Sequence, residues 1–155
     1  MRCLVIEENE GERRTALSEL LSLEIQVEDA QNGDKALDVL RADNAFDAIF
    51  IGDWSRGMKR ADFMSHIPSI YPVILNRPRP KIILMVDENL AVNAEPNVIG
   101  GFLLLVKVGK LPQLPRGVDS QVLKPVGGDE VAIRFWEMGV SLGRHSFVPP
   151  SETRK

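Results

Sequence analysis

Acidic side chains and one lysine stand where apolar runs of the sequence stop. Glu7 and Glu8 follow the first run, and Asp53 follows a later one. Asp87 and Lys124 stand at the ends of two further runs. Carboxylates that converge repel one another unless a proton or a cation bridges them, and Mg²⁺ is a hard cation that prefers oxygen ligands. A lysine supplies a mobile positive charge for an anion. These residue types could hold Mg²⁺ and a phosphoryl group if the fold brings them together.

The apolar runs have the length and composition of β-strands. Residues 3–6, 48–51, 81–86 and 121–123 are short and nearly continuous apolar runs, which is typical of strands covered on both faces. Residues 24–28 instead alternate between polar and apolar, which predicts a half-buried strand near a sheet edge. We therefore expect five strands, with the candidate residues at or beside their ends.

Segments with helical periodicity separate these strands. The first begins at residue 10, places Ala16 and Leu20 on an apolar stripe and turns Arg13 outward. Asp34 is placed to cap the second helix, which reaches about residue 43. Two further helices are predicted, over residues 61–67 and 129–142. Trp136, in the last of them, is expected to pack in the core.

Five strands that alternate with helices predict an α/β fold with a doubly wound five-stranded parallel sheet. Residues 87–120 are rich in glycine and proline and enlarge the segment between strands four and five, where we expect one helix at most. One domain is predicted over residues 1–145, followed by a mobile C-terminal tail over residues 146–155. Ligands of such sheets collect beyond the carboxyl ends of the strands, where the candidate residues stand.

Four short pieces of the sequence, taken together, carry a resemblance to a known family. They are residues 4–9 (LVIEEN), 30–37 (AQNGDKAL), 50–54 (FIGDW) and 123–125 (LKP). Their order and spacing resemble the response-regulator receiver domain of two-component signalling, a CheY-like (βα)5 fold of the flavodoxin-like type. The resemblance covers about residues 1–143 and is interrupted across 87–120.

The resemblance implies a role for most of the residues at the strand ends. Glu7 and Glu8 would be the acidic pair, with Glu8 nearest to a direct Mg²⁺ ligand. Asp53 would be the phosphoacceptor and a further Mg²⁺ ligand, and Mg²⁺ would neutralise the charge that develops during phosphoryl transfer. Lys124 would hold the phosphoryl group, and its bond to Pro125 is often cis in this family.

Departures from the family pattern indicate an atypical or degenerate receiver. In the family, the residue that corresponds to Asp47 stands five positions before the phosphorylated residue, which places Gly52 rather than Asp53 at that site. This matters because one step along a strand reverses the face to which a side chain points. The fourth strand ends in Met-Val-Asp at residues 85–87, where the family has a Ser or Thr that bonds the phosphoryl oxygen. The stretch before Lys124 is also longer than in a typical receiver.

Three functions stay open at this point. The first is a stand-alone receiver that acts in signal transduction through protein–protein interaction, with phosphorylation weak or lost. The second is a Mg²⁺-dependent response regulator phosphorylated on Asp53, and the third is a small-ligand sensor that uses residues 87–120. The plain alternative for Glu7 and Glu8 is an acidic strand end in solvent, and for Lys124 a solvated lysine before a structural proline.

Composition and motifs narrow the remaining classes. The net charge of −3, from 19 basic and 22 acidic residues, gives no broad positive field for nucleic acid. The longest apolar stretch, residues 98–106, falls far short of the ~20 residues that span a bilayer. No Gly-rich phosphate loop or nucleophile elbow occurs, so we expect no enzyme beyond self-phosphorylation from a phosphodonor. The expected partners are signalling proteins: a histidine kinase, a phosphotransferase or a downstream target, with a homodimer left open.

The remaining residues of note have ordinary explanations. Cys3 is the single cysteine and lies among apolar residues, which predicts a buried reduced thiol and fits the cytoplasm. Arg56, Lys59 and Arg60 form a basic cluster that we expect in a solvated loop. Trp54 stands beside Asp53 and could shield that carboxylate.

Overall fold

The structure is a computed structural model that describes residues 1–72, 78–87 and 114–142. The predicted tail at residues 146–155 lies outside the described residues, as does most of the predicted insert at residues 87–120. The division of the chain into a domain over residues 1–145 and a tail therefore stays a prediction.

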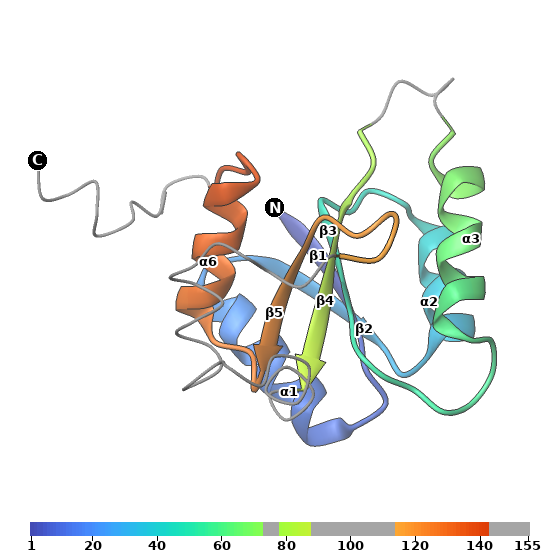
Figure 1. Ribbon diagram of the computed structural model, residues 1–155, viewed down its shortest axis with the longest axis horizontal. Helices are drawn as coiled ribbons and strands as arrows, with labels where there is room; N and C mark the ends of the chain where they lie inside the picture. The colour runs from blue at the N-terminus through green and yellow to red at the C-terminus, as the bar shows by residue number, and fades with distance from the viewer. Residues whose placement is uncertain (73–77, 88–113, 143–155) are drawn as a thin grey trace, which may run out of the picture.

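The described strands form one parallel sheet (Figure 1). They are β1 (Arg2–Ile6), β2 (Gln26–Ala30), β3 (Ala48–Ile51), β4 (Lys81–Asp87) and β5 (Ser120–Lys124). Their order in the sheet is β2-β1-β3-β4-β5, so the chain winds first to one side of β1 and then to the other. The five-stranded, doubly wound parallel sheet expected from the sequence is confirmed.

The edge strand β2 begins later than its sequence pattern predicts. Alternation suggested a start at residue 24, but Glu24 has a φ of 61°, which is left-handed rather than extended backbone. Its N–H donates to the carbonyl oxygen of Leu21 at 2.9 Å, so it belongs to the turn after the first helix. The strand therefore starts at Gln26, and its place at the sheet edge agrees with the prediction.

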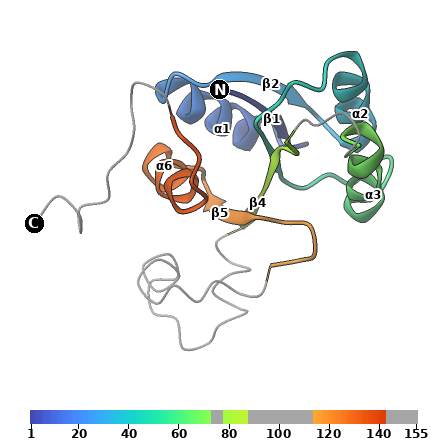
Figure 2. The ribbon, with the colours of Figure 1, turned by 90° about the horizontal axis from the view of Figure 1, so that it is seen from above.

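The described helices cover both faces of the sheet (Figure 2). They are α1 (Glu10–Ser22), α2 (Gly33–Ala42), α3 (Arg60–Ile70) and α6 (Gly128–Glu137). Helices α1 and α6 pack on one face, and α2 and α3 pack on the other. None of these helices is long and apolar enough to cross a membrane.

Side chains of β1 alternate between the two cores that this layering creates. Leu4 and Ile6 pack toward α2 and α3, whereas Cys3 and Val5 pack toward α1 and α6, and none of the four is exposed. Fully burying an aliphatic side chain such as valine, leucine or isoleucine contributes about 1.5–3 kcal/mol. These contacts on both faces fix the register of β1 and therefore the position of Glu7, the next residue.

Helix α2 starts at a different cap from the one expected. Asn32 Oδ1 accepts a hydrogen bond from the Lys35 N–H at 2.9 Å, which makes Asn32 the cap. The prediction that Asp34 caps this helix is wrong. Its carboxylate accepts instead from the N–H of Met58 at 3.0 Å, so it ties the start of α2 to the loop after β3.

Helices α3 and α6 differ in length from their sequence predictions. Helix α3 continues past residue 67 to Ile70 although Pro68, in its last turn, has no N–H to donate to the helix. Helix α6 ends at Glu137 rather than near residue 142, since Gly139 adopts a φ of 73° and closes the helix. Trp136 is 43% exposed, so its predicted place in the core is wrong.

Candidate functional site

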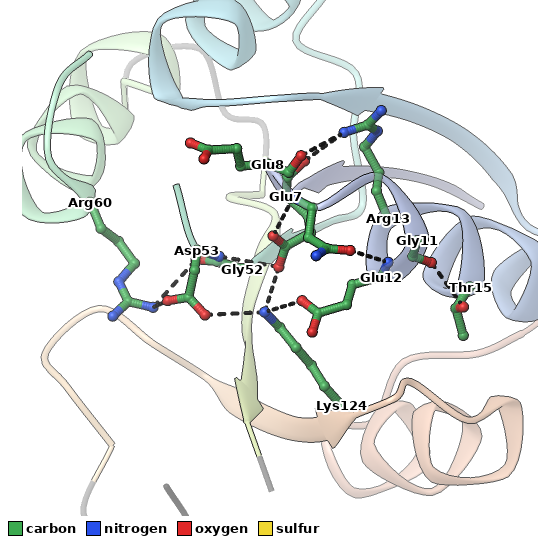
Figure 3. A network of polar contacts seen from close by, with 11 residues as sticks. Glu7, Glu8, Gly11, Glu12, Arg13, Thr15, Gly52, Asp53, Arg60 and Lys124 are labelled. Carbon is green, nitrogen blue, oxygen red and sulfur yellow. Dashed lines mark hydrogen bonds and ion pairs between the residues drawn. The ribbon is translucent and has the colours of Figure 1, made fainter. Parts of the chain in front are cut away.

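The ends of three strands bring Glu7, Asp53 and Lys124 to one edge of the sheet (Figure 3). Glu7 follows β1, Asp53 lies just past β3, and Lys124 is the last residue of β5. Parallel pairing places Ile6 opposite Ile51, so the chain leaves β1 and β3 at the same edge. This is the edge at which the sequence placed the site.

Lys124 lies at the centre of this cluster. Its side chain is 7% exposed, and Nζ donates to Glu7 Oε1 at 2.5 Å, Glu12 Oε2 at 2.9 Å and Asp53 Oδ2 at 3.1 Å. An ammonium group has three donors and no acceptor, so these carboxylates use its full hydrogen-bonding capacity. Lys124 is therefore not the solvated lysine of the plain alternative. Its peptide bond to Pro125 is cis, as the resemblance implied.

Glu12 was not among the site residues expected from the sequence. It lies in the first turn of α1, where its N–H donates to the capping Asn9 Oδ1 at 2.9 Å. The Asn9-to-Glu12 spacing is that of a capping box, so the turn itself was recognisable. That pattern predicts a carboxylate turned back to the helix start, whereas the Glu12 carboxylate reaches Lys124.

Glu7 is buried because Gly52 leaves room for it. The Glu7 residue is 2% exposed, and its oxygens accept from the N–H of Asn9 at 2.9 Å and of Asp53 at 3.3 Å besides the bond to Lys124. A Cβ atom at position 52 would overlap Glu7 Oε1. The Glu7 carboxylate therefore lies where a side chain on residue 52 would begin, and it is not an acidic strand end in open solvent.

The electrostatic balance around Lys124 favours its charged form. Burial works to lower the pKa of the Lys124 ammonium, but hydrogen bonds to Glu7, Glu12 and Asp53 outweigh that effect and raise the pKa above its ordinary value. A buried ammonium that keeps its proton is a permanent positive charge. The site therefore contains a fixed cation supplied by the chain itself.

Asp53 brings an exposed carboxylate to Lys124 from the β3 side. Its side chain is 58% exposed, with Oδ2 3.1 Å from Lys124 Nζ and Oδ1 3.7 Å from Arg60 Nη1. Gly52 and Asp53, the two residues that the sequence offered for the phosphorylated position, thus both border the cluster around Lys124. Gly52 supplies space for Glu7, and Asp53 supplies the carboxylate, whose role as phosphoacceptor stays a prediction. Arg60 belongs to the basic cluster that was predicted in a solvated loop, but it is the first residue of α3 and faces Asp53.

Glu8 turns away from Lys124. Its carboxylate accepts from the Ser55 N–H at 2.7 Å and from the Ser55 hydroxyl at 2.9 and 3.0 Å. Hydrogen bonds from the Ser55 backbone and hydroxyl lower the pKa of Glu8 below its ordinary value. The side chain expected to ligate Mg²⁺ directly points away from Lys124 (Figure 3) and instead ties the link between β1 and α1 to the loop after β3.

Mg²⁺ does not fit the side-chain arrangement as it stands. The carboxylate of Glu7 is buried against Lys124, and that of Glu8 is taken by Ser55. Across residues 1–72, 78–87 and 114–142, no cluster of three or more acidic, histidine or cysteine side chains is arranged to hold a metal ion. A hard cation needs several convergent oxygen ligands, and here the convergent ones surround an ammonium.

Arg13 fixes the bend of the chain between β1 and α1. The prediction that it faces outward is wrong, since it is only 9% exposed. Its Nη1 donates to the carbonyl oxygens of Glu7 at 2.9 Å and Glu8 at 3.3 Å, and its Nε donates to Asp29 Oδ2 at 2.9 Å. These bonds hold the backbone from which the Glu7 and Glu8 side chains point in different directions (Figure 3).

The loop between β3 and α3 is fastened by its own residues. Trp54 Nε1 donates to the Met58 carbonyl oxygen at 2.7 Å, and its ring meets the Phe63 ring edge-on at 6.1 Å between centroids. Gly57 has a φ of 81°, a conformation that favours glycine. Trp54 is thus anchored toward α3, and this anchoring fixes the start of the loop beside Asp53.

The end of β4 lies beside the cluster. Asp87 is paired with Lys124 in the ladder between β4 and β5, and Met85 is 2% exposed in the core. The strand therefore brings a carboxylate, rather than a serine or threonine hydroxyl, to this edge. The family has a Ser or Thr at the end of this strand, so the chain departs from the family pattern at a position next to Lys124.

Several solved structures with the same fold are described as response regulators or their receiver domains. A putative response regulator from Chloroflexus aurantiacus has a TM-score of 0.61 at 16% identity, over 92% of this chain and 98% of that one. A CheY-like receiver domain from Methanospirillum hungatei has a TM-score of 0.57 at 14% identity, over 89% and 94%. The chemotaxis response regulator CheY4 of Vibrio cholerae has a TM-score of 0.57 at 15% identity, over 88% and 96%.

The similarity is one of fold rather than of sequence. No protein-family model and no curated protein sequence matches the chain. The chain has the CheY-like fold of response-regulator receiver domains, as its motifs suggested. Fold alone does not fix activity, which has to be argued from the site.

Proposed function

We propose that this chain is a receiver-like module that acts in signal transduction by binding other proteins, with phosphorylation of Asp53 weak or lost. The observation that carries the proposal is the buried pair of Glu7 and Lys124 over Gly52. The side chains of this pair occupy the space in which a phosphorylated side chain would meet the lysine.

Charge argues against a phosphoryl group at this site. Phosphorylation of an aspartate replaces its singly charged carboxylate by a phosphoryl group that carries about −1.5 to −2 charges, and these have to be neutralised nearby. Here Lys124 already donates to Glu7 and Glu12, so a phosphoryl group on Asp53 would receive only the one bond that the Asp53 carboxylate now accepts, unless it displaced Glu7 or Glu12. Displacing Glu7 would leave a carboxylate buried without its counter-ion, which is strongly unfavourable.

The partners we propose are signalling proteins, because several solved structures that share this fold are described as response regulators. A histidine kinase, a phosphotransferase or a downstream target would meet the protein in the cytoplasm. That location agrees with the single cysteine, Cys3, being a fully buried free thiol.

Intact mass after incubation with a small acyl phosphate and Mg²⁺ tests the proposal. We expect the mass of the protein to stay unchanged, with Asp53→Ala as the matched control. A gain of one phosphoryl group that Asp53→Ala abolishes would overturn the proposal. A gain that survives in Asp53→Ala would place the modification elsewhere and leave Asp53 unmodified.

A second candidate is a Mg²⁺-dependent phosphoacceptor at Asp53. The favouring observation is that its side chain is 58% exposed and lies 3.1 Å from Lys124 Nζ, so a phosphodonor could reach it. The same mass experiment decides between the two functions. The third hypothesis, a small-ligand sensor in residues 87–120, rests almost entirely on residues outside the described part of the chain.

A further inference from the structure

We propose that the ammonium of Lys124 is the resident cation of this site, and that it keeps Mg²⁺ and Ca²⁺ away from the carboxylates of Glu7, Glu12 and Asp53. The inference deepens the proposed function and rests on it. A site whose carboxylates are neutralised by a lysine of the chain keeps its structure without a bound metal ion. Three observations support it: coordination, burial and charge.

The coordination of Lys124 Nζ resembles that of a bound cation. Three carboxylate oxygens from three separate parts of the chain lie 2.5, 2.9 and 3.1 Å from the nitrogen. Ca²⁺ binds carboxylate oxygens at about 2.3–2.6 Å and Mg²⁺ at about 2.0–2.1 Å. Glu7 Oε1 already lies at such a distance, and small movements of the exposed Glu12 and Asp53 side chains would bring their oxygens to a metal placed where the nitrogen now lies.

Burial shows which side of the cluster is closed. The side chains of Glu7 and Lys124 are 2% and 7% exposed, whereas those of Glu12 and Asp53 are 38% and 58% exposed. A cation from solvent would therefore approach between Glu12 and Asp53. On that side it would meet the ammonium of Lys124 and the guanidinium of Arg60, which lies 3.7 Å from Asp53.

Charge makes the lysine necessary where it is. Without Lys124, three carboxylates would surround one point and repel one another, as carboxylates that share a site do. With Lys124 present, an added divalent cation would face a like charge a few ångströms away in a partly dehydrated place. The lysine thus removes both the need for a metal and the room for it.

Replacing Lys124 should convert the cluster into a divalent-cation site. In Lys124→Ala the space of the side chain opens and the carboxylates remain. We expect this variant to bind Mg²⁺ or Ca²⁺ at least ~10-fold more tightly than the unaltered protein, because removal of a nearby like charge changes affinity by at least that factor. Its melting temperature should rise when either chloride salt is added, relative to NaCl of equal ionic strength.

Two further variants keep the experiment decisive. In Lys124→Gln the new side chain is neutral and shorter than lysine but keeps an N–H donor for Glu7. This variant therefore tests the inference in case Lys124→Ala folds only when a cation is added. Lys124→Ala/Glu12→Gln removes one ligand and should lose the gained affinity. Lys35→Ala removes an exposed lysine on α2 and should behave like the unaltered protein.

Calorimetric titration with MgCl₂ and CaCl₂ measures the cation affinity of each of these proteins, and thermal melting followed by circular dichroism measures its melting temperature. Equal cation affinity in the unaltered protein and in Lys124→Ala would overturn the inference. So would a lack of gain in both Lys124 variants, or a gain that Glu12→Gln leaves intact. Phosphorylation by mass is a separate readout, so an unphosphorylated protein with no hidden cation site would overturn this inference and leave the proposed function standing.

Discussion

The carboxylate of Glu7 lies directly over the backbone of Gly52. A Cβ atom at position 52 would overlap Glu7 Oε1 and stand 2.9 Å from the carbonyl oxygen of Ile6, which cannot move without disturbing β1. We therefore expect Gly52→Ala to lower the free energy of unfolding by about 1–3 kcal/mol, the usual effect of overpacking a well-filled site. Urea denaturation measures this change.

Gly127→Ala is the matched control for that substitution. Nothing lies within 4 Å of a Cβ atom at position 127, and its φ of −112° suits any residue. Because Gly127 is the N-cap of α6, where glycine is preferred to alanine, a loss of no more than ~1 kcal/mol is expected there. Equal losses in the two variants would show that Gly52 matters for backbone freedom rather than for the room that it gives Glu7.

Glu7 and Glu12 should contribute unequally to stability although both bind Lys124. The Glu7 side chain is 2% exposed, and breaking a buried ion pair typically destabilises by ~3 kcal/mol or more. The Glu12 side chain is 38% exposed, so Glu12→Gln should lower the free energy of unfolding by no more than ~1 kcal/mol. Denaturation of Glu7→Gln and Glu12→Gln side by side checks the order, and a larger effect at Glu12 would contradict the burial argument.

Most of the fold could be predicted from the sequence because its signals are local. Continuous apolar runs predicted β1, β3, β4 and β5 to within about two residues at each end, the usual uncertainty of such boundaries. The errors fell where tertiary contacts decide. Glu24 alternates like a strand residue but lies in a turn, and Arg13 looks like a surface residue but hydrogen-bonds buried backbone.

The candidate site could be predicted only in part. Strand-end position and the family resemblance identified Glu7, Asp53 and Lys124, which do meet. Sequence spacing says nothing of side-chain direction past a strand end, so it could not show Glu8 turning to Ser55. Nor could it show Glu12 reaching Lys124 across 112 positions of sequence, because that contact exists only after the sheet has formed.

Ser55→Ala should raise the pKa of the Glu8 carboxyl. The Ser55 hydroxyl is one of two groups of that residue that stabilise the charged form of Glu8, and the other, the backbone N–H at 2.7 Å, remains after the substitution. The pKa should therefore move only part of the way back to its ordinary value. A carboxyl-carbon NMR titration measures the shift. Ser69→Ala, which removes a hydroxyl bonded to the His66 carbonyl on α3, should leave Glu8 unchanged.

Glu130 should contribute more to the stability of the protein in mild acid than at neutral pH. Burial raises the pKa of Glu130 to about 6, and the hydrogen bond from the Leu123 N–H and the nearby Arg134 oppose this only in part. The unfolded chain titrates near 4.5. Between those pH values the folded state binds more protons, so this group's contribution to the free energy of unfolding rises as the pH falls from 6 to 4.5.

The substitution Glu130→Gln isolates that contribution. It keeps an oxygen to accept from the Leu123 N–H and removes the buried charge, whose Oε2 accepts no hydrogen bond among the described residues. The variant should be more stable than the unaltered protein at pH 7 by up to ~2 kcal/mol, and the difference should shrink toward pH 4.5. Glu137→Gln, an exposed carboxylate on the same helix bonded to Arg134, should show no such convergence. Urea denaturation at several pH values measures both differences, and a constant gap between Glu130→Gln and the unaltered protein would mean that Glu130 is charged throughout.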